Sequence, residues 1–191
     1  SDVCSSDLCS PVISDCTFSN NSDTNGGGAI FGTDCDLSLS RCSFTNNTSP
    51  YGGALNFNQG AQGTISRCSF QNNVATYGGG AVALAYNTDC TVVDCLFADN
   101  STTNGGAGAM ALNYSDVSDV INCVFVRNHS NYGGGGICAA NSATNTVKNC
   151  TFFANSCQSN GGESGGALFS LSVASYTVTN SIFWGNTAQS G

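Results

Sequence analysis

Two short segments decide the fold: Cys-Ser-Phe-Thr-Asn-Asn at residues 42–47 and Gly-Gly-Ala-Leu at residues 52–55. The first recurs along the chain as Cys-x-Phe-x-x-Asn at intervals of 26 to 31 residues, and a glycine-rich copy of the second follows each of the first six copies. Self-similarity with a period of this size is typical of solenoids, in which each repeat forms one coil. We therefore predict a single repeat domain over residues 1–191.

The repeated positions form columns when the copies are aligned. The phenylalanines are Phe18, Phe44, Phe70, Phe97, Phe125, Phe152 and Phe183. The asparagines are Asn21, Asn47, Asn73, Asn100, Asn128, Asn155 and Asn186. The cysteines are Cys16, Cys42, Cys68, Cys95, Cys123 and Cys150, with Ser181 in the seventh copy. Because stacked repeats contact their neighbours, each column is expected to become a ladder along the solenoid axis.

The residues before each cysteine show how a coil is built. In the second copy, apolar Leu39 stands three positions before Cys42 and polar Arg41 stands one position before it, and every other copy has the same apolar and polar pair. Strict alternation along a strand would place both on one face, so the chain must bend between them and turn the polar residue outward. Three short strands per coil follow: one ending at the apolar column, one across Cys-x-Phe and one across the Gly-Gly-Ala-Leu type of segment.

These columns predict an all-β fold, a single-stranded right-handed parallel β-helix of about seven coils. Helices are disfavoured because glycine pairs recur along the chain and no 3.6-residue apolar stripe is present. An antiparallel sandwich also has short strands and turns, but it does not require Phe, Asn and Gly to repeat at a fixed period.

Each repeated residue type has a physical role in such a stack. Phenylalanine fills the narrow interior, where identical rings pack against one another along the axis. Asparagine closes a corner, because it tolerates the left-handed backbone conformation and its amide can bond to the copies in adjacent coils. We expect this ladder to be structural rather than ligand-binding. Paired glycines turn the chain where a side chain would collide with the next coil.

The few charged side chains also fall into register. Three of the four cations in the chain have a carboxylate one repeat away. The expected pairs are Asp15 with Arg41, Arg67 with Asp94, and Asp99 with Arg127. Exposed pairs contribute ~0–1 kcal/mol each, so their main effect is to fix which coil stacks on which.

The chain has 12 cysteines, which favours an oxidising compartment. Those of the ladder would have Cβ atoms ~4.8 Å apart, longer than a disulfide prefers, so we expect mostly free, buried thiols. Cys9 and Cys35 each precede a ladder cysteine by seven residues and are the best candidates for a disulfide. No partner is assigned to Cys4, Cys90, Cys138 or Cys157.

Composition excludes several partners. The net charge is −8, and the 4 Lys and Arg residues cannot neutralise a row of phosphates, so nucleic acid is not expected. The charge also disfavours attachment to an anionic membrane, and no apolar run approaches the ~18 residues of a membrane span. Zinc is disfavoured because the chain has no CxxC pair and its only histidine is His129, which we expect at an exposed corner. No cofactor or metal is expected.

The paired motifs resemble those of the chlamydial polymorphic outer-membrane proteins and related bacterial β-helix repeat proteins. The residues that carry the resemblance are Phe-x-x-Asn at 44–47 with Gly-Gly-Ala-Leu at 52–55, and Phe-x-x-Asn at 70–73 with Gly-Gly-Ala-Val at 79–82. Two of the six glycine motifs, at 107–110 and 134–137, lack the Gly-Gly-Ala core. Members of that family are surface-exposed and implicated in adhesion and self-association, so the resemblance implies an extracellular or cell-surface location.

We therefore expect an extracellular structural or adhesive protein rather than an enzyme. Its expected partners are further copies of itself, head to tail in a filament, and cell-surface or carbohydrate ligands. The alternatives are a carbohydrate-active β-helix enzyme, such as a polysaccharide lyase or hydrolase, and a fragment of a larger adhesin. The enzyme is disfavoured because Asp34, Asp36, Asp89 and Glu163 are scattered and no catalytic residues stand out. An acidic turn at 33–36 is interpreted as solvated rather than as a calcium site.

Overall fold

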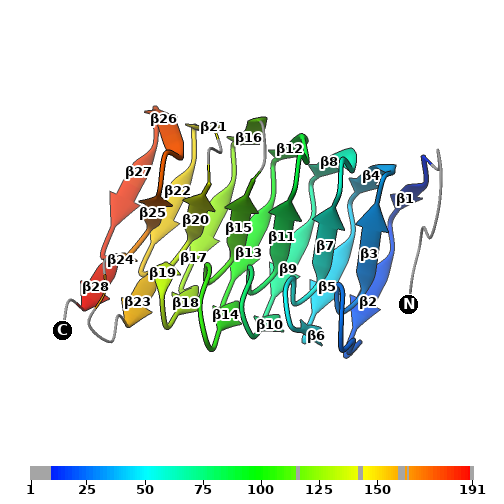
Figure 1. Ribbon diagram of the computed structural model, residues 1–191, viewed down its shortest axis with the longest axis horizontal. Coiled ribbons are helices and arrows are strands. Elements are labelled where there is room, and N and C mark those ends of the chain that lie inside the picture. The colour runs from blue at the N-terminus through cyan, green and yellow to red at the C-terminus, as the bar shows by residue number, and fades with distance from the viewer. Residues whose placement is uncertain (1–9, 115–116, 142–143, 159–161, 163, 190–191) are drawn as a thin grey trace.

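The computed structural model describes residues 10–114, 117–141, 144–158, 162 and 164–189. Short strands wind into coils that stack in one direction, and every strand pairing is parallel (Figure 1). No helix occurs in this part of the chain. The predicted all-β parallel β-helix is confirmed.

The strands form four long sheets, numbered here in the order in which a coil meets them. The first sheet contains β1 (Val12–Ser14), β4 (Asp36–Ser40), β8 (Gln62–Ser66), β12 (Cys90–Val93), β16 (Val117–Ile121), β21 (Thr144–Lys148) and β26 (Ser175–Thr179). The second contains β2 (Thr17–Ser19), β5 (Ser43–Thr45), β9 (Ser69–Gln71), β13 (Leu96–Ala98), β17 (Val124–Val126), β22 (Thr151–Phe153) and β27 (Ile182–Trp184).

The third sheet contains the shortest strands: β6 (Thr48–Ser49), β10 (Val74–Ala75), β14 (Ser101–Thr102), β18 (His129–Ser130), β23 (Ser156–Gln158) and β28 (Thr187–Gln189). The fourth contains β3 (Ile30–Thr33), β7 (Leu55–Asn58), β11 (Val82–Ala85), β15 (Met110–Asn113), β20 (Ile137–Ala140) and β25 (Leu168–Leu171). A further pair joins β19 (Gly133–Gly134) to β24 (Ser164–Gly165). The first, second and fourth sheets hold the predicted strands of each coil, and the third adds a shorter one.

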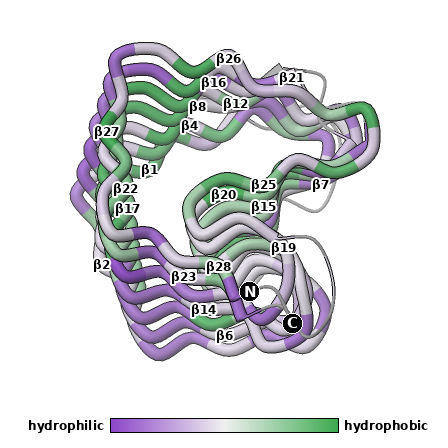
Figure 2. The backbone as a smooth tube through the Cα atoms, turned by 90° about the vertical axis from the view of Figure 1, so that its left-hand side faces the viewer, coloured by the Kyte–Doolittle hydropathy of each residue, from purple (hydrophilic) through white to green (hydrophobic). Residues whose placement is uncertain are grey.

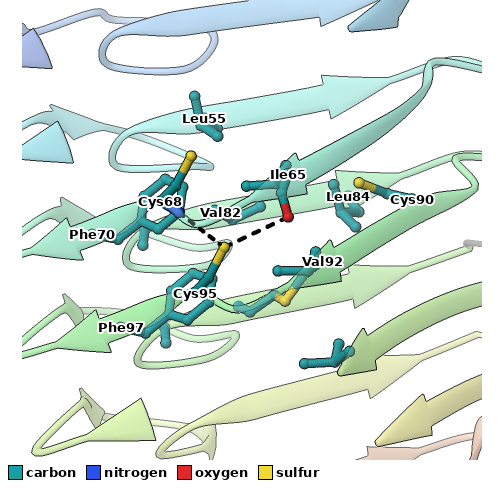
Figure 3. Close-up of a cluster of buried hydrophobic side chains, with 14 of the residues drawn as sticks. Leu55, Ile65, Cys68, Phe70, Val82, Leu84, Cys90, Val92, Cys95 and Phe97 are labelled. Atoms are coloured by element: carbon teal, nitrogen blue, oxygen red, sulfur yellow. Dashed lines mark hydrogen bonds between the residues drawn. The ribbon is translucent and has the colours of Figure 1, made fainter. Parts of the chain in front are cut away.

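The phenylalanine ladder lies at the centre of the core (Figure 3). Phe97 in β13 pairs with Phe70 in β9 and with Phe125 in β17, so the register between coils is one repeat. Successive rings stack with centroids 4.7–4.9 Å apart and interplanar angles of 1–6°. The five rings from Phe44 to Phe152 are 0% exposed, whereas Phe183 in the last described coil is 44% exposed.

The side-chain amide of each asparagine in the middle of the ladder makes four hydrogen bonds. Nδ2 of Asn100 donates to Oδ1 of Asn128 at 2.9 Å and to the carbonyl oxygen of Phe70 at 3.0 Å. Its Oδ1 accepts from the backbone N–H and from Nδ2 of Asn73, at 3.0 and 2.9 Å. The ladder asparagines from Asn47 to Asn155 are 0% exposed, so each buried amide is satisfied by its neighbours in the stack.

The bends of each coil fall on single residues with a left-handed backbone. The residue before each ladder cysteine turns outward with a positive φ, for example 53° at Arg41 and 55° at Asp94. At the next corner, φ is 56° at Asn46, the residue before the ladder asparagine Asn47. The expectation that the ladder asparagine itself takes this conformation is wrong by one position, because the preceding residue makes the bend while the asparagine turns its amide into the stack.

Charged side chains pair between adjacent coils. The ion pairs are Arg41 with Asp15 at 2.6 Å, Arg127 with Asp99 at 2.8 Å, and Arg67 with Asp94 at 3.9 Å. The hydrogen bond from the Arg41 guanidinium lowers the pKa of the Asp15 carboxyl. All these side chains are exposed, so the pairs align the coils without adding much to stability.

Replacing Phe97 with alanine is expected to lower the free energy of unfolding by about 3–5 kcal/mol, because it leaves a cavity in the middle of the ladder. Denaturant unfolding followed by circular dichroism measures this. Phe153→Ala is the matched control, since Phe153 lies on the outer face of the same sheet and is 43% exposed. Its cost should stay near ~0.5 kcal/mol. Equal costs for the two variants would contradict an internal ladder.

Asn100→Leu is expected to destabilise the protein by at least ~3 kcal/mol, because several buried donors and acceptors lose a partner at once. The groups affected are the amides of Asn73 and Asn128 and the carbonyl oxygen of Phe70. Asn104→Leu is the control, since Asn104 is exposed and, like Asn100, does not have a left-handed backbone. A cost at Asn100 no larger than at Asn104 would show that the buried amides do not hold the coils together.

Candidate functional site

The outer face of the fourth sheet forms the floor of a groove. Along β11, Val82 and Leu84 are 0% exposed in the core, and Ala83 between them faces outward. The outward residues of six strands form one column: Phe31, Asn56, Ala83, Ala111, Cys138 and Phe169. At ~4.8 Å per coil this floor is ~24 Å long. Small side chains make the middle of the floor deep, and an aromatic ring closes each end.

Tyrosines line both walls of this groove, which we call the tyrosine groove. Tyr51, Tyr77 and Tyr132 lie in turns that lead into the fourth sheet, and Tyr86 lies in a turn that leaves it. Each is 45–54% exposed. The Tyr86 ring is supported by Tyr114 in the next coil, whose ring stacks on it at 5.2 Å and 7°. Phenol rings and hydroxyls therefore border the groove over several coils.

The tyrosine groove is an open hollow of about 560 Å³. Figure 2 looks along the stack and shows the backbone of β15, β20 and β25 between two turns of the coil. Ala83, Ala111 and Cys138, the outward residues of three successive coils, line the hollow, so it runs parallel to the solenoid axis, across the strands rather than along them. A long ligand would contact equivalent positions in successive coils.

Tyr86 has a backbone conformation that tyrosine rarely adopts. Its φ is 56°, and that of Tyr114 is 54°. The equivalent turn positions in other coils are occupied by Asp34, Gln59, Asn141 and Ser172, all with positive φ. Asn and Asp tolerate this region, whereas a bulky side chain there is unusual and strained by ~1–3 kcal/mol. Left-handed residues also occur at the other bends of the coils, as at Arg41 and Gln59, so it is the exposed ring of Tyr86 rather than the conformation that makes this wall a candidate functional surface.

Asparagine amides supply the polar groups of the tyrosine groove. Asn56, Asn58, Asn113 and Asn141 lie in its lining, and Nδ2 of Asn141 donates to Oδ1 of Asn113 at 2.6 Å. Oδ1 of Asn58 has no hydrogen-bond partner in the described part of the chain. The described lining holds no Asp, Glu, Lys, Arg or His. The groove is therefore neutral and offers both donors and acceptors.

Glycine allows neighbouring coils to approach closely beside the wall of this groove. Gly106 has a φ of 80°, and a Cβ there would lie 2.0 Å from the carbonyl oxygen of Gly78. A Cβ on Gly53, in the Gly-Gly-Ala-Leu motif, would likewise lie 2.0 Å from the carbonyl oxygen of Gly80. The repeated glycines are thus required by backbone contact between coils, as the repeat predicted.

The ladder cysteines lie in the core beside the phenylalanines, except for one. Cys42, Cys68, Cys95, Cys123 and Cys150 are buried. Sγ of Cys95 donates to the carbonyl oxygen of Ile65 at 3.6 Å and accepts from the N–H of Cys68 at 3.4 Å (Figure 3). Cys16 is exposed, contrary to the expectation, because in the described part of the chain a coil covers it on one side only.

Among the cysteines outside the ladder, the sequence predicted a disulfide only for Cys9 and Cys35. No two cysteines within the described ranges are linked. Cys35 is buried, while Cys9, its predicted disulfide partner, lies outside those ranges. Cys138, for which the sequence suggested no place, stands in the floor of the tyrosine groove, and burial raises its thiol pKa to about 12. In the sequence, Cys138 directly follows Ile137, the aliphatic residue of the glycine motif. This position was the signal that could have predicted its place on the outer face of the strand.

A second polar cluster lies on the third sheet, around His129. Its Nδ1 is 2.9 Å from Oγ of Ser156, and its Nε2 is 3.1 Å from Oδ1 of Asn131. The expectation of an exposed corner histidine is wrong, since the ring is half-buried between neighbours. This chain of contacts, from a hydroxyl through an imidazole to an amide, superficially resembles a nucleophile with its base. Ser156 is, however, the ordinary register partner of His129, so the contact follows from stacking.

The carboxylates do not converge on a site. Asp34 borders a shallow hollow with Gln59 and Asn87, which adjoins the tyrosine groove at Tyr86 but is not part of its lining. No group of three or more His, Cys, Asp and Glu side chains is placed to hold a metal ion within the residues described. Glu163 lies outside those residues. The tyrosine groove, rather than an acidic cluster, is therefore the best-formed candidate site.

Together these features define a parallel β-solenoid with a neutral groove along one face. The family model described as "Right handed beta helix region" matches residues 2–152, and the chain belongs to that family. Proteins of this fold include enzymes and structural proteins, so membership does not fix an activity. Neither the curated proteins nor the solved structures gave a match. The described residues contain no helix that is long and apolar enough to cross a membrane.

Thiol accessibility tests this arrangement. In the native protein, alkylation with iodoacetamide at pH 8 is expected to label Cys16 and to spare Cys95 and Cys138, because Cys95 is buried in the core and burial raises the pKa of the Cys138 thiol. Labelling of all three after denaturation is the control, and peptide mapping reads the sites. Rapid native labelling of Cys95 would contradict its place in the core.

Proposed function

We propose that this chain is an extracellular adhesive protein without catalytic activity, which holds its ligand in the tyrosine groove. The observation that carries the proposal is the lining of that groove. Exposed tyrosines and asparagine amides border it over several coils, and the described lining contains no carboxylate, imidazole or amine. Such a surface binds by contact and hydrogen bonding but lacks the imidazoles and carboxylates that most often serve as general acids and bases.

Several features support an extracellular location. Cysteine is abundant, lysine and arginine are few, and the chain is rich in Asn, Ser and Thr. The paired Phe-x-x-Asn and Gly-Gly-Ala-Leu motifs resemble those of the chlamydial polymorphic outer-membrane proteins, whose members are surface-exposed. Because the coils carry short turns, the adhesive surface is the solenoid itself rather than an appended loop.

The carbohydrate-active enzyme is the weaker alternative. Enzymes that cleave glycosidic bonds by hydrolysis use two carboxyl groups that flank the bond. Asp34 is not in the lining of the tyrosine groove, and Asp15, Asp94 and Asp99 form ion pairs elsewhere. The described lining therefore holds no pair of carboxyl groups that could flank a bound glycosidic bond.

End-to-end self-association stays a prediction. The last described coil exposes Ile182, Phe183 and Trp184 at 61%, 44% and 71%. Strand β27, which carries them, pairs with β22 on one side. This face would accept a further coil, and light scattering of the purified chain would detect assembly through a second copy.

Adhesion is tested with beads coated with the folded protein and applied to cell layers and extracellular matrix. Beads carrying the native sequence are expected to attach, and beads carrying Ala111→Arg to attach at least ~10-fold less, because the new side chain fills the floor of the groove. Lys148→Ala, on the first sheet, is the control and should attach normally. Antibody labelling of intact producing cells tests the location. Absence of attachment, or release of cleaved sugar from the matrix, would contradict the proposal.

A further inference from the structure

The tyrosine groove has a length, a neutrality and a repeating chemistry that together define a class of ligand. We propose that it binds a neutral glycan chain, which lies parallel to the solenoid axis and contacts several coils. This inference rests on the adhesive function proposed above and names the ligand of the same groove.

The negative charge of the chain disfavours binding of the common anionic polymers. The net charge of the chain is −8, and the described lining holds no cation that could pair with a carboxylate, sulfate or phosphate. Three of the four cations, Arg41, Arg67 and Arg127, are held by carboxylates in ion pairs outside the groove. A polyanion would therefore be repelled without any local compensation, whereas a neutral ligand meets no electrostatic cost.

The polar groups match hydroxyls. A tyrosine hydroxyl and an asparagine amide each act as donor and as acceptor, and so does a sugar hydroxyl. Tyr77 and Tyr132 present their phenols on one wall and Tyr86 on the other, and Asn113 is in the lining beside the Tyr86 wall. The floor at Ala83 and Ala111 is apolar and suits the C–H faces of sugar rings. The groove thus pairs polar edges with an apolar base, as an amphipathic sugar ring requires.

The strand arrangement disfavours an extended peptide. A peptide that adds to a sheet needs an unpaired strand edge. In the middle of the fourth sheet, β11 is bonded to β7 on one side and to β15 on the other. The groove also runs across these strands, so a ligand in it meets side chains rather than free backbone groups. A polysaccharide fits this better, because tyrosines and asparagines from several coils present hydroxyls and amides along the groove.

The turn at Tyr86 permits a variant that removes the ring and keeps the fold. Asn141 occupies the equivalent position two coils away with a φ of 58°, so Tyr86→Asn places at 86 a residue that the same turn already uses. Combined with Tyr77→Ala it removes a phenol from each wall. Phe153→Ala is the matched control, because it removes an aromatic ring of similar exposure, 43%, from the second sheet.

Affinity electrophoresis in native gels tests the proposal. The gels contain one soluble polysaccharide each: galactomannan, mixed-linkage β-glucan, arabinoxylan or dextran as neutral probes, and polygalacturonate or hyaluronan as anionic ones. The native protein is expected to be retarded by at least one neutral probe and by neither anionic one. The double variant should bind that probe at least ~10-fold more weakly, and Phe153→Ala should bind as the native protein does. Circular dichroism verifies that all variants are folded.

Three results would overturn the inference. They are retardation by the anionic probes alone, no retardation by any neutral probe, and an equal loss of binding in Phe153→Ala. Tight binding of a soluble proline-rich peptide in a competition experiment would likewise assign the groove to a protein partner. If beads attach to matrix while no neutral glycan binds, the ligand class is wrong and adhesion stands. If a glycan binds but beads do not attach, the adhesive function fails instead.

Discussion

Hydrogen bonding from one coil to the next fixes the distance between equivalent residues, and the rest of the structure depends on that spacing. The buried amide of Asn100 bonds to Asn73 on one side and Asn128 on the other. At this spacing the phenylalanine rings contact one another with centroids 4.7–4.9 Å apart. A change of residue in one coil therefore disturbs two neighbours, which explains why the interior positions repeat so closely.

The same constraint explains why the surface is free to carry function. Side chains that point outward at turns do not share the cross-section with the neighbouring coils, so Asp34, Gln59 and Tyr86 can occupy equivalent positions. Along the fourth sheet, the outward column changes from Phe31 to Ala83. The interior thus defines the coil, and the outer face of one sheet defines the site.

The sequence predicted the fold because the near-constant spacing of the repeated residues directly implies the ladders. Phe97 and Asn100 stand at fixed offsets in each repeat, and stacking places equivalent residues together without further information. The tyrosine groove was not predicted, because its walls come from turns on either side of a strand and its floor has no constant residue type. How far the turns project depends on the bends before and after the strand. The shift of the left-handed residue from Asn47 to Asn46 shows the same limit, since a motif fixes which residues recur but not which of two neighbours makes the bend.

The turn at position 86 does not require a tyrosine in order to fold. The chain places asparagine at the equivalent turn in another coil, where the left-handed backbone costs little. Tyrosine at 86 and 114 is harder to accommodate, and stacking of the two rings at 5.2 Å offsets part of that cost. A purely structural turn gains nothing from a phenol that is 52% exposed. The exposed hydroxyl and ring edge remain free for the neutral, hydrogen-bonding ligand that we propose for the groove beside them.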